Sequence, residues 1–104
     1  MRFCYITTAY PSYLGSFYQS RPGLQDEPFN IQYDALLDDG FGRIGAWSAT
    51  LPAHGYEVLE IVANAMPQQL AWARENGFKV PDRQAILAIV LRQLVQWRPE
   101  VIFM

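Results

Sequence analysis

The chain carries few charged residues and only one cysteine. Charged side chains make up 17% of its 104 residues and the formal net charge is −2, so the sequence lacks the basic excess that attracts nucleic acid. Cys4 has no second cysteine with which to form a disulfide or share a metal ion. We therefore expect no nucleic-acid partner, and we expect Cys4 to be an inert core residue.

Long apolar segments are also missing. No apolar run reaches the roughly 18 residues that a membrane span requires. Met1 leads into a strand pattern without the basic and apolar regions of a signal peptide. These two observations predict a protein without a transmembrane segment, located in the cytoplasm.

Three signatures of nucleotide-binding or Mg²⁺-binding α/β proteins are absent. The sequence has neither the G-x-G-x-x-G of dinucleotide-binding domains nor a P-loop. Thr7 and Thr8 stand where a receiver domain would carry acidic Mg²⁺ ligands. The adjacent Asp38 and Asp39 are expected in a solvated turn, because neighbouring helical residues point in different directions. The sequence therefore predicts no cofactor-binding residue and no metal site.

Apolar residues, in contrast, are abundant. They make up 51% of the chain, which is high for a small domain. A length of 104 residues fits one domain spanning residues 1–104 with a modest core. We expect part of its apolar surface to face another domain or subunit.

The chain is organised around the segment RFCYITTAY at residues 2–10. Its unbroken apolar run from Phe3 to Ile6 is typical of a strand buried on both faces of a parallel sheet. Thr7 and Thr8 end this run, and Pro11 turns the chain away. Since open α/β sheets bind ligands at the carboxyl ends of their strands, we expect a site at this loop.

Helix and strand patterns alternate along the rest of the chain. Apolar runs predict further strands within 56–64 and 101–104. The predicted helices are 12–19, a segment from the cap Asn30 to a break at 39–42, 43–53 ended by Gly55, 67–75, and 83–97 capped by Asp82. This alternation predicts an α/β, Rossmann-like fold with a three-stranded parallel sheet, a fragment of a doubly wound domain. Residues 3–7 should lie between 58–63 and 101–104, giving strand order 2-1-3.

Apolar residues at helical spacing predict which helix faces are buried. The predicted core positions are Ile44, Trp47, Leu51, Ile86, Val90, Leu94 and Trp97. On this interpretation, Leu94→Ala would cost about 2–5 kcal/mol of stability, as is typical of truncating a buried leucine.

Three segments spread over the chain carry a family resemblance: RFCYITTAYPSYLG, LPAHGYEVLEIVAN and RPEVIFM. The first is similar to the opening strand and loop of GT-B fold glycosyltransferases, where Tyr-Pro leads into a glycine-containing loop. The second is similar to their next helix end and strand, and the third resembles a later strand that flanks the first. Ser12 and Tyr13 follow Pro11 where the family often has a glycine pair, and Tyr56 stands in place of the usual histidine.

The resemblance implies the acceptor-side N-terminal domain of a nucleotide-sugar-dependent glycosyltransferase, incomplete at its C-terminus. It also implies that a C-terminal domain of the parent chain binds the donor and is the partner of this domain. The acceptor would be a sugar or a glycolipid, and residues 1–104 alone would be inactive. The alternative is a non-catalytic α/β interaction module that binds a protein partner through its aromatic loop.

The candidate acceptor-binding residues follow the first strand: Thr7, Thr8, Tyr10, Tyr13 and Gly15. The threonines could bond an acceptor at the sheet edge or cap a turn. The tyrosines, with Tyr18, could stack on sugar rings or close a small core. No catalytic residue is identified, because His54 is expected to be exposed at a helix end on the opposite, amino edge of the sheet.

Overall fold

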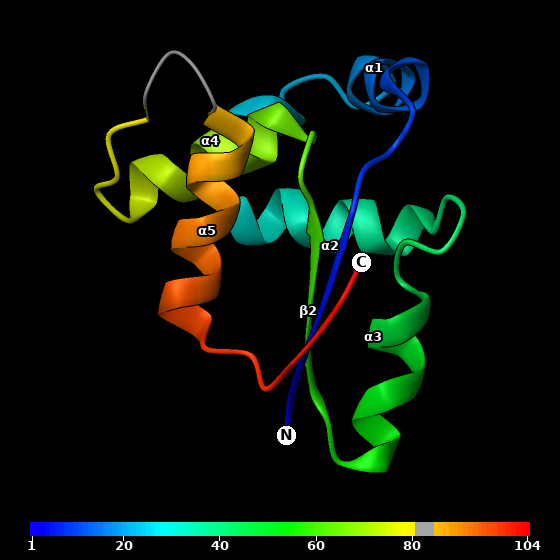
Figure 1. The fold of residues 1–104 in the computed structure, drawn as a ribbon. Helices are drawn as coiled ribbons and strands as arrows, with labels where there is room; N and C mark the ends of the chain where they lie inside the picture. The colour runs from blue at the N-terminus through cyan, green and yellow to red at the C-terminus, as the bar shows by residue number, and fades with distance from the viewer. Residues whose placement is uncertain (81–84) are drawn as a thin grey trace.

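The sheet has three parallel strands in the predicted order. The computed structural model describes residues 1–80 and 85–104. β1 (Arg2–Thr7) lies between β2 (Glu57–Val62) and β3 (Val101–Phe103), and both pairings are parallel. Phe3 lies opposite Val58 on one side and Val101 on the other. The predicted Rossmann-like α/β topology is thereby confirmed (Figure 1).

Helices connect and flank the strands. Their bounds are α1 (Pro11–Gln19), the 3-10 turn η1 (Leu24–Asp26), α2 (Phe29–Asp39), α3 (Ala46–Thr50), the 3-10 turn η2 (Leu51–His54), α4 (Met66–Glu75) and α5 (Ala85–Trp97). Pro11 and Pro67 occupy first-turn positions of α1 and α4, where the missing N–H costs nothing. The predicted helices 12–19 and 67–75 are thus confirmed to within one residue. The predicted cap Asp82 and helix start at Arg83 lie outside the described residues.

Two predicted helix starts are wrong. α2 begins at Phe29 rather than after a cap at Asn30, because the Phe29 N–H donates to Glu75 Oε2 of α4 at 2.7 Å. α3 begins at Ala46 rather than at Arg43, because Gly45 adopts a left-handed conformation with φ of 88°. The segment that follows α3 is a 3-10 turn ended by left-handed Gly55, as its capping position predicted.

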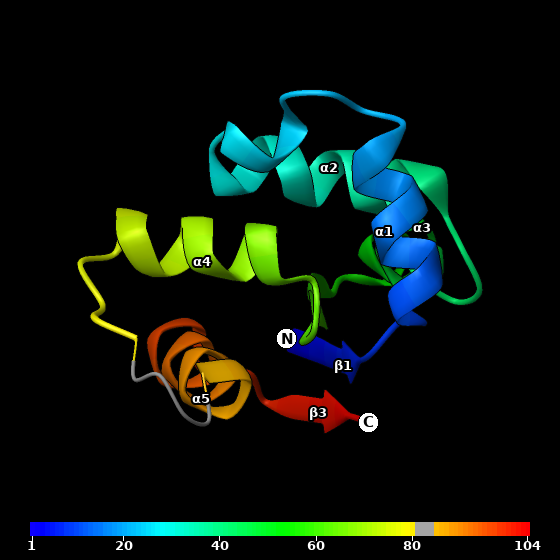
Figure 2. The ribbon, with the colours of Figure 1, turned by 90° about the horizontal axis from the view of Figure 1, so that it is seen from above.

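Alternate residues of the strands face two different layers of helices. Cys4 and Ile61 pack with Val90 of α5 on one face. On the other face, Val62 packs with Leu36 of α2, and Tyr5 contacts Trp47 of α3. Figure 2 shows α2 and α3 on one side of the sheet and α5 on the other, with α4 between α2 and α5. Each face of the central strand is therefore covered, as its unbroken apolar run indicated.

Cys4 is a core residue without access to solvent. Its side chain is fully buried and makes no disulfide. Burial raises the pKa of the Cys4 thiol to about 11, because the thiolate would be poorly solvated there. The prediction that Cys4 is a buried core residue is confirmed.

The buried face of α5 differs from the predicted stripe. Ile86 is wrongly placed in the core, since it is 42% exposed, and Leu94 and Trp97 are only partly buried. The helix instead buries Ile89, Val90 and Gln93. α5 is apolar around most of its circumference, so apolar spacing alone does not select the face that meets the sheet.

A chain of buried amides helps to select that face. Gln93 Nε2 donates to Gln69 Oε1 of α4 at 2.7 Å, and Gln69 Nε2 donates to the Val62 carbonyl at 3.0 Å. Both side chains are buried. Since buried polar groups need partners, these two hydrogen bonds fix the rotation of α5 about its axis.

Trp47 and Leu51, also predicted as core, are partly buried. The Trp47 ring packs on the sheet as expected, with ring centroids 5.2 Å from Phe3 and 5.4 Å from Phe103. Ile44 is buried, but it precedes α3 and packs in the cluster that joins α1 and α2 to the end of β2. The helix over this region is too short to bring all three residues to one interface.

An apolar surface remains exposed on α5 and along β3. Its most exposed residues include Leu87, Leu91, Val95, Ile102 and Met104. A hollow of about 570 Å³ lies between α5 and the sheet, with Ile6 and Ala63 at its base. The high apolar content predicted such a surface. Within residues 1–80 and 85–104, no helix combines the length and apolar character needed to cross a membrane.

These burial differences give a first stability prediction. Ile89→Ala should cost about 2–5 kcal/mol because Ile89 is fully buried against Trp72 and Ala73. Leu94→Ala should cost less, because part of the Leu94 side chain already contacts water. Urea unfolding measures both losses, with Val95→Ala as the exposed control at 70% exposure. A larger loss for Leu94→Ala than for Ile89→Ala would show that α5 is docked by another face.

Candidate functional site

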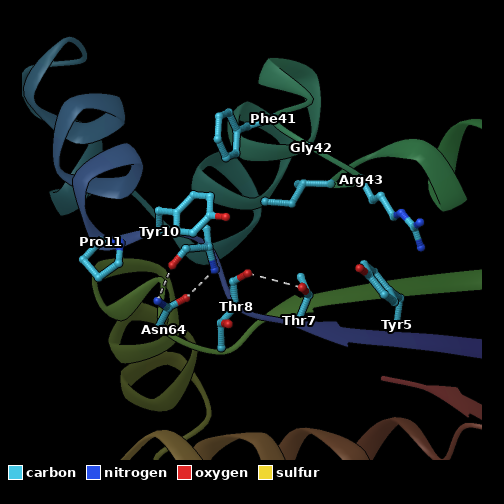
Figure 3. A pocket seen from close by; sticks show the side chains of 11 residues that line it. Tyr5, Thr7, Thr8, Tyr10, Pro11, Phe41, Gly42, Arg43 and Asn64 are labelled. Atoms are coloured by element: carbon cyan, nitrogen blue, oxygen red, sulfur yellow. Dashed lines mark hydrogen bonds between the residues drawn. The ribbon is translucent and has the colours of Figure 1, made fainter.

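A pocket of about 550 Å³ opens at the carboxyl end of β1 (Figure 3). Open α/β sheets bind ligands at this edge. The pocket is formed by β1 and its loop, by the loop after α2, and by Asn64 in the turn after β2. Its lining residues are Tyr5, Thr7, Thr8, Ala9, Tyr10, Pro11, Phe41, Gly42, Arg43, Ile44 and Asn64.

Asn64 fixes the loop after β1. Its Nδ2 donates to the Ala9 carbonyl at 2.7 Å, and its Oδ1 accepts from the Ala9 N–H at 3.0 Å. The Ala63 N–H also donates to the Thr7 carbonyl at 2.8 Å, extending the pairing of β1 with β2. Because both backbone groups of Ala9 are bonded, the pocket wall from Thr7 to Tyr10 has a defined position.

An aromatic cluster forms the wall opposite the strand. The Phe41 ring stacks on Tyr13, with centroids 4.0 Å apart, and Tyr10 meets Phe41 edge to face at 6.3 Å. The Tyr13 hydroxyl donates to Asp39, whose other oxygen accepts from Arg21 at 2.9 Å. Burial and the bond to Asp39 raise the pKa of Tyr13 above its usual value. One Tyr13 face and its hydroxyl are thus engaged within the protein.

Tyr5 projects from β1 to the floor of the pocket. The residue is only 8% exposed, and its ring contacts the rings of Trp47 and Phe103 at centroid distances of 5.6 and 5.7 Å. Figure 3 shows its hydroxyl directed into the pocket, on the side where the Arg43 side chain extends. Among the described residues, neither the Tyr5 hydroxyl nor the Arg43 guanidinium has a hydrogen-bond partner.

A buried carboxylate holds the loop that carries Arg43. Glu60 of β2 accepts from the Gly45 N–H through Oε1 at 2.9 Å, and from the Ser48 N–H and hydroxyl through Oε2 at 2.9 and 2.6 Å. The Glu60 N–H in turn donates to the Tyr33 hydroxyl at 3.0 Å. Burial raises the pKa of Tyr33. Glu60 therefore joins β2, the start of α3 and the Arg43 loop.

The structure brings three of the five predicted acceptor-binding residues into this pocket: Thr7, Thr8 and Tyr10. The Thr7 hydroxyl donates to the Thr8 carbonyl at 3.3 Å, which leaves its lone pairs available. Tyr13 stands behind Phe41 in the aromatic cluster. Gly15 lines a separate pocket of about 570 Å³ between α1 and the start of α4.

Tyr18 also belongs to that second pocket. Its hydroxyl donates to Gln32 Oε1 at 2.8 Å, and burial raises the pKa of Tyr18 to about 12. Gln32 is buried and donates to the carbonyls of Gln25 and Glu27. Tyr18 is thus part of the packing between α1, η1 and α2.

Sequence reasoning missed several pocket residues with polar or aromatic side chains: Tyr5, Phe41, Arg43 and Asn64. The apolar run from Phe3 to Ile6 predicts Tyr5 only as part of the buried strand. Asn64 follows the second strand, so the carboxyl-edge rule that selected Thr7 and Thr8 could have found it. Phe41 and Arg43 belong to the glycine-rich break after α2, which carries no local signal for a position beside β1.

Two further predictions concern residues outside the pocket. His54 is exposed at the end of η2, next to Gly55, whose carbonyl lies near the Met1 amino group at the amino edge of the sheet. Its predicted place away from the carboxyl edge is confirmed. Asp38 and Asp39 are exposed as expected, but they are the last two residues of α2 and do not lie in a turn. Asp39 is also bonded to Tyr13 and Arg21.

None of the known protein families, curated protein sequences or solved structures with which the chain was compared matches it.

Proposed function

We propose that this chain is the acceptor-side domain of a nucleotide-sugar-dependent glycosyltransferase of the GT-B type. The observation that supports the proposal best is the polar and aromatic pocket at the carboxyl end of β1. In the proposed function this pocket binds a sugar or glycolipid acceptor, and a C-terminal domain of the parent chain binds the activated donor.

The lining suits a polyhydroxylated ligand. Hydroxyls of Tyr5, Thr7 and Thr8 can donate and accept hydrogen bonds. The Tyr10 ring is 71% exposed and offers an apolar face to the C–H groups of a sugar ring. A few polar groups beside aromatic surface are the usual composition of a small-molecule site.

The same lining explains why the domain would be inactive alone. It contains no Asp, Glu, His or Cys that could act as a general base or nucleophile. The remaining groups can bind and orient an acceptor, so the donor and the groups that complete catalysis would come from the partner domain. The exposed apolar surface of α5 and β3 is available for contact with that domain. A cytoplasmic location is part of the proposal and agrees with a single free cysteine.

The proposal predicts a division of binding between the two domains. Residues 1–104 should show no calorimetric binding to uridine or guanosine diphosphate sugars. Acceptor sugars should shift backbone amide NMR signals around Thr7, Tyr10 and Asn64. Tyr10→Ala should weaken this binding about fivefold or more, since stacking contacts contribute roughly 1 kcal/mol. Val95→Ala, a truncation at an equally exposed position on α5, should leave it unchanged.

Two results would contradict the proposal. Tight binding of a nucleotide sugar by residues 1–104 would contradict the assignment of donor binding to the C-terminal domain. Absence of any sugar binding would favour the alternative, an interaction module that binds a protein partner through its exposed aromatic loop. Exposure of Tyr10 and of Phe41 is the observation on which that alternative rests.

A further inference from the structure

We propose that the acceptor carries an anionic group, a carboxylate or a phosphate, which the Tyr5 hydroxyl and the Arg43 guanidinium bind together. This inference rests on the proposed function and specifies the substrate class of the same pocket. Three observations support it: the charge of the lining, the state of Tyr5, and the way in which the Arg43 loop is held.

The pocket lining carries one positively charged side chain and no negatively charged one. Arg43 is the only charged residue among the eleven that line it, whereas the chain as a whole has a net charge of −2. Arg2 and Arg21 form ion pairs with Glu57 and Asp39. Arg43 has no carboxylate partner among the described residues. An unpaired arginine on the wall of a pocket without carboxylates favours an anionic ligand.

Tyr5 supplies a second donor at the same place. More than nine-tenths of the residue is buried, and its ring contacts the rings of Trp47 and Phe103. A phenylalanine would fill this space equally well, and the hydroxyl has no partner in the described part of the chain. The hydroxyl oxygen itself is accessible from the pocket, since it is not among the buried unpartnered atoms of the described residues. An accessible hydroxyl on a ring fixed by packing can donate to a ligand oxygen without rearrangement of the side chain.

The backbone that carries Arg43 is well supported. Gly42 and Gly45 adopt left-handed conformations on either side of it, with φ of 61° and 88°. Ile44 is buried between them, and Glu60 bonds the Gly45 N–H. A guanidinium on a fixed backbone can form two parallel bonds to a carboxylate or a phosphate, with less loss of entropy than on a mobile loop.

The arrangement of the lining gives the ligand an orientation. In Figure 3 the threonines lie between Tyr10 on one side and the pair of Tyr5 and Arg43 on the other. An acidic sugar can place its charged group at Tyr5 and Arg43, its hydroxyls at Thr7 and Thr8, and its ring beside Tyr10. One ligand can therefore contact both ends of the pocket at once.

Titration of isotope-labelled residues 1–104 with four probes tests the inference: glucose, glucuronic acid, glucose 6-phosphate and inorganic phosphate. At least one acidic sugar should bind about ten times more tightly than glucose, and added salt should weaken only the acidic sugars. The tighter of the two acidic sugars identifies the anion as carboxylate or phosphate.

Matched variants assign the effect to the two side chains. Arg43→Gln should weaken acidic sugars at least about tenfold and glucose little, because a charge-assisted hydrogen bond is lost. Arg74→Gln, which removes the same charge from an exposed site on α4 outside the pocket, should change neither. Tyr5→Phe should weaken the acidic sugars several-fold, whereas Tyr56→Phe at the amino edge should not. The amide spectrum of each variant shows that it is folded.

The outcomes separate this inference from the proposed function. Equal affinity for glucose and both acidic sugars, with no effect of Arg43→Gln, would overturn the anionic class and leave sugar binding intact. Inorganic phosphate bound as tightly as glucose 6-phosphate, and lost in Arg43→Gln, would support the anion site while removing the sugar from the proposed function. Failure of all four probes to bind would overturn both.

Discussion

Replacing Gly45 by alanine is expected to destabilise the fold by about 2–5 kcal/mol, the sum of a conformational cost and a steric cost. Gly45 has φ of 88°, a left-handed conformation that costs a residue with a Cβ roughly 1–2 kcal/mol. A Cβ at this position would also lie 2.5 Å from the Leu37 carbonyl oxygen. Relieving such an overlap in a packed region costs typically about 1–3 kcal/mol. Urea unfolding of the variant measures the total.

Gly55→Ala provides the matched control. Gly55 has nearly the same backbone angle, with φ of 86°, but a Cβ there would meet no atom within 4 Å. This variant should lose only the conformational part, about 1–2 kcal/mol. Equal losses of unfolding free energy in the two variants would mean that Leu37 moves aside without cost. The close approach at Gly45 would then not contribute to the destabilisation.

Replacing Glu60 by alanine is expected to cost about 2–4 kcal/mol. The Glu60 side chain is 1% exposed and accepts from the N–H groups of Gly45 and Ser48. Each buried N–H left without an acceptor costs roughly 1–3 kcal/mol. Removing a buried carboxylate also removes its desolvation cost, which offsets part of the loss. Thermal or urea unfolding measures the net effect.

Glu57→Ala is the control on the same strand. Glu57 is exposed and pairs with Arg2 at 3.0 Å, a surface ion pair that contributes no more than about 1 kcal/mol. If Glu60→Ala were no more destabilising than Glu57→Ala, the bonds to the α3 start would not stabilise the fold. In the double variant Gly45→Ala and Glu60→Ala, the combined loss should be smaller than the sum of the single losses, because the two residues share one hydrogen bond.

The fold could be predicted where local pattern and burial agree. The apolar run from Phe3 to Ile6 has helices over both faces, and this is why it identified a central parallel strand. The face of α5 could not be predicted in the same way. Nearly every side of this helix is apolar, and its orientation depends on a buried amide, Gln93, bonded to Gln69 of α4. A hydrogen bond between side chains of two different helices, 24 residues apart, cannot be read from the spacing of apolar residues within one helix.

The same distinction applies to the candidate site. Thr7, Thr8 and Tyr10 line the pocket because they follow the strand, and the rule for carboxyl edges finds them from position alone. Arg43 reaches the pocket because Glu60 holds the turn at Gly45. Helical spacing predicted a helix through this turn, since the pattern of Ile44, Trp47 and Leu51 contains no information about a carboxylate on β2. Arg43, the charged residue of the pocket lining, could therefore not be predicted from local sequence patterns.

The central place of β1 in the sheet has a consequence for the order of folding. β1 precedes both of its neighbours in the chain, and the contact from Arg2 to Glu100 spans 98 residues, against 55 for the contact from Arg2 to Glu57. Helices can form from local contacts, but β1 must await two long-range pairings, and closing such long loops is slow. Until β3 pairs with β1, one edge of the apolar strand β1 is unpaired. The folding chain is then most open to association with other copies through the strand that later lies at the centre of its sheet.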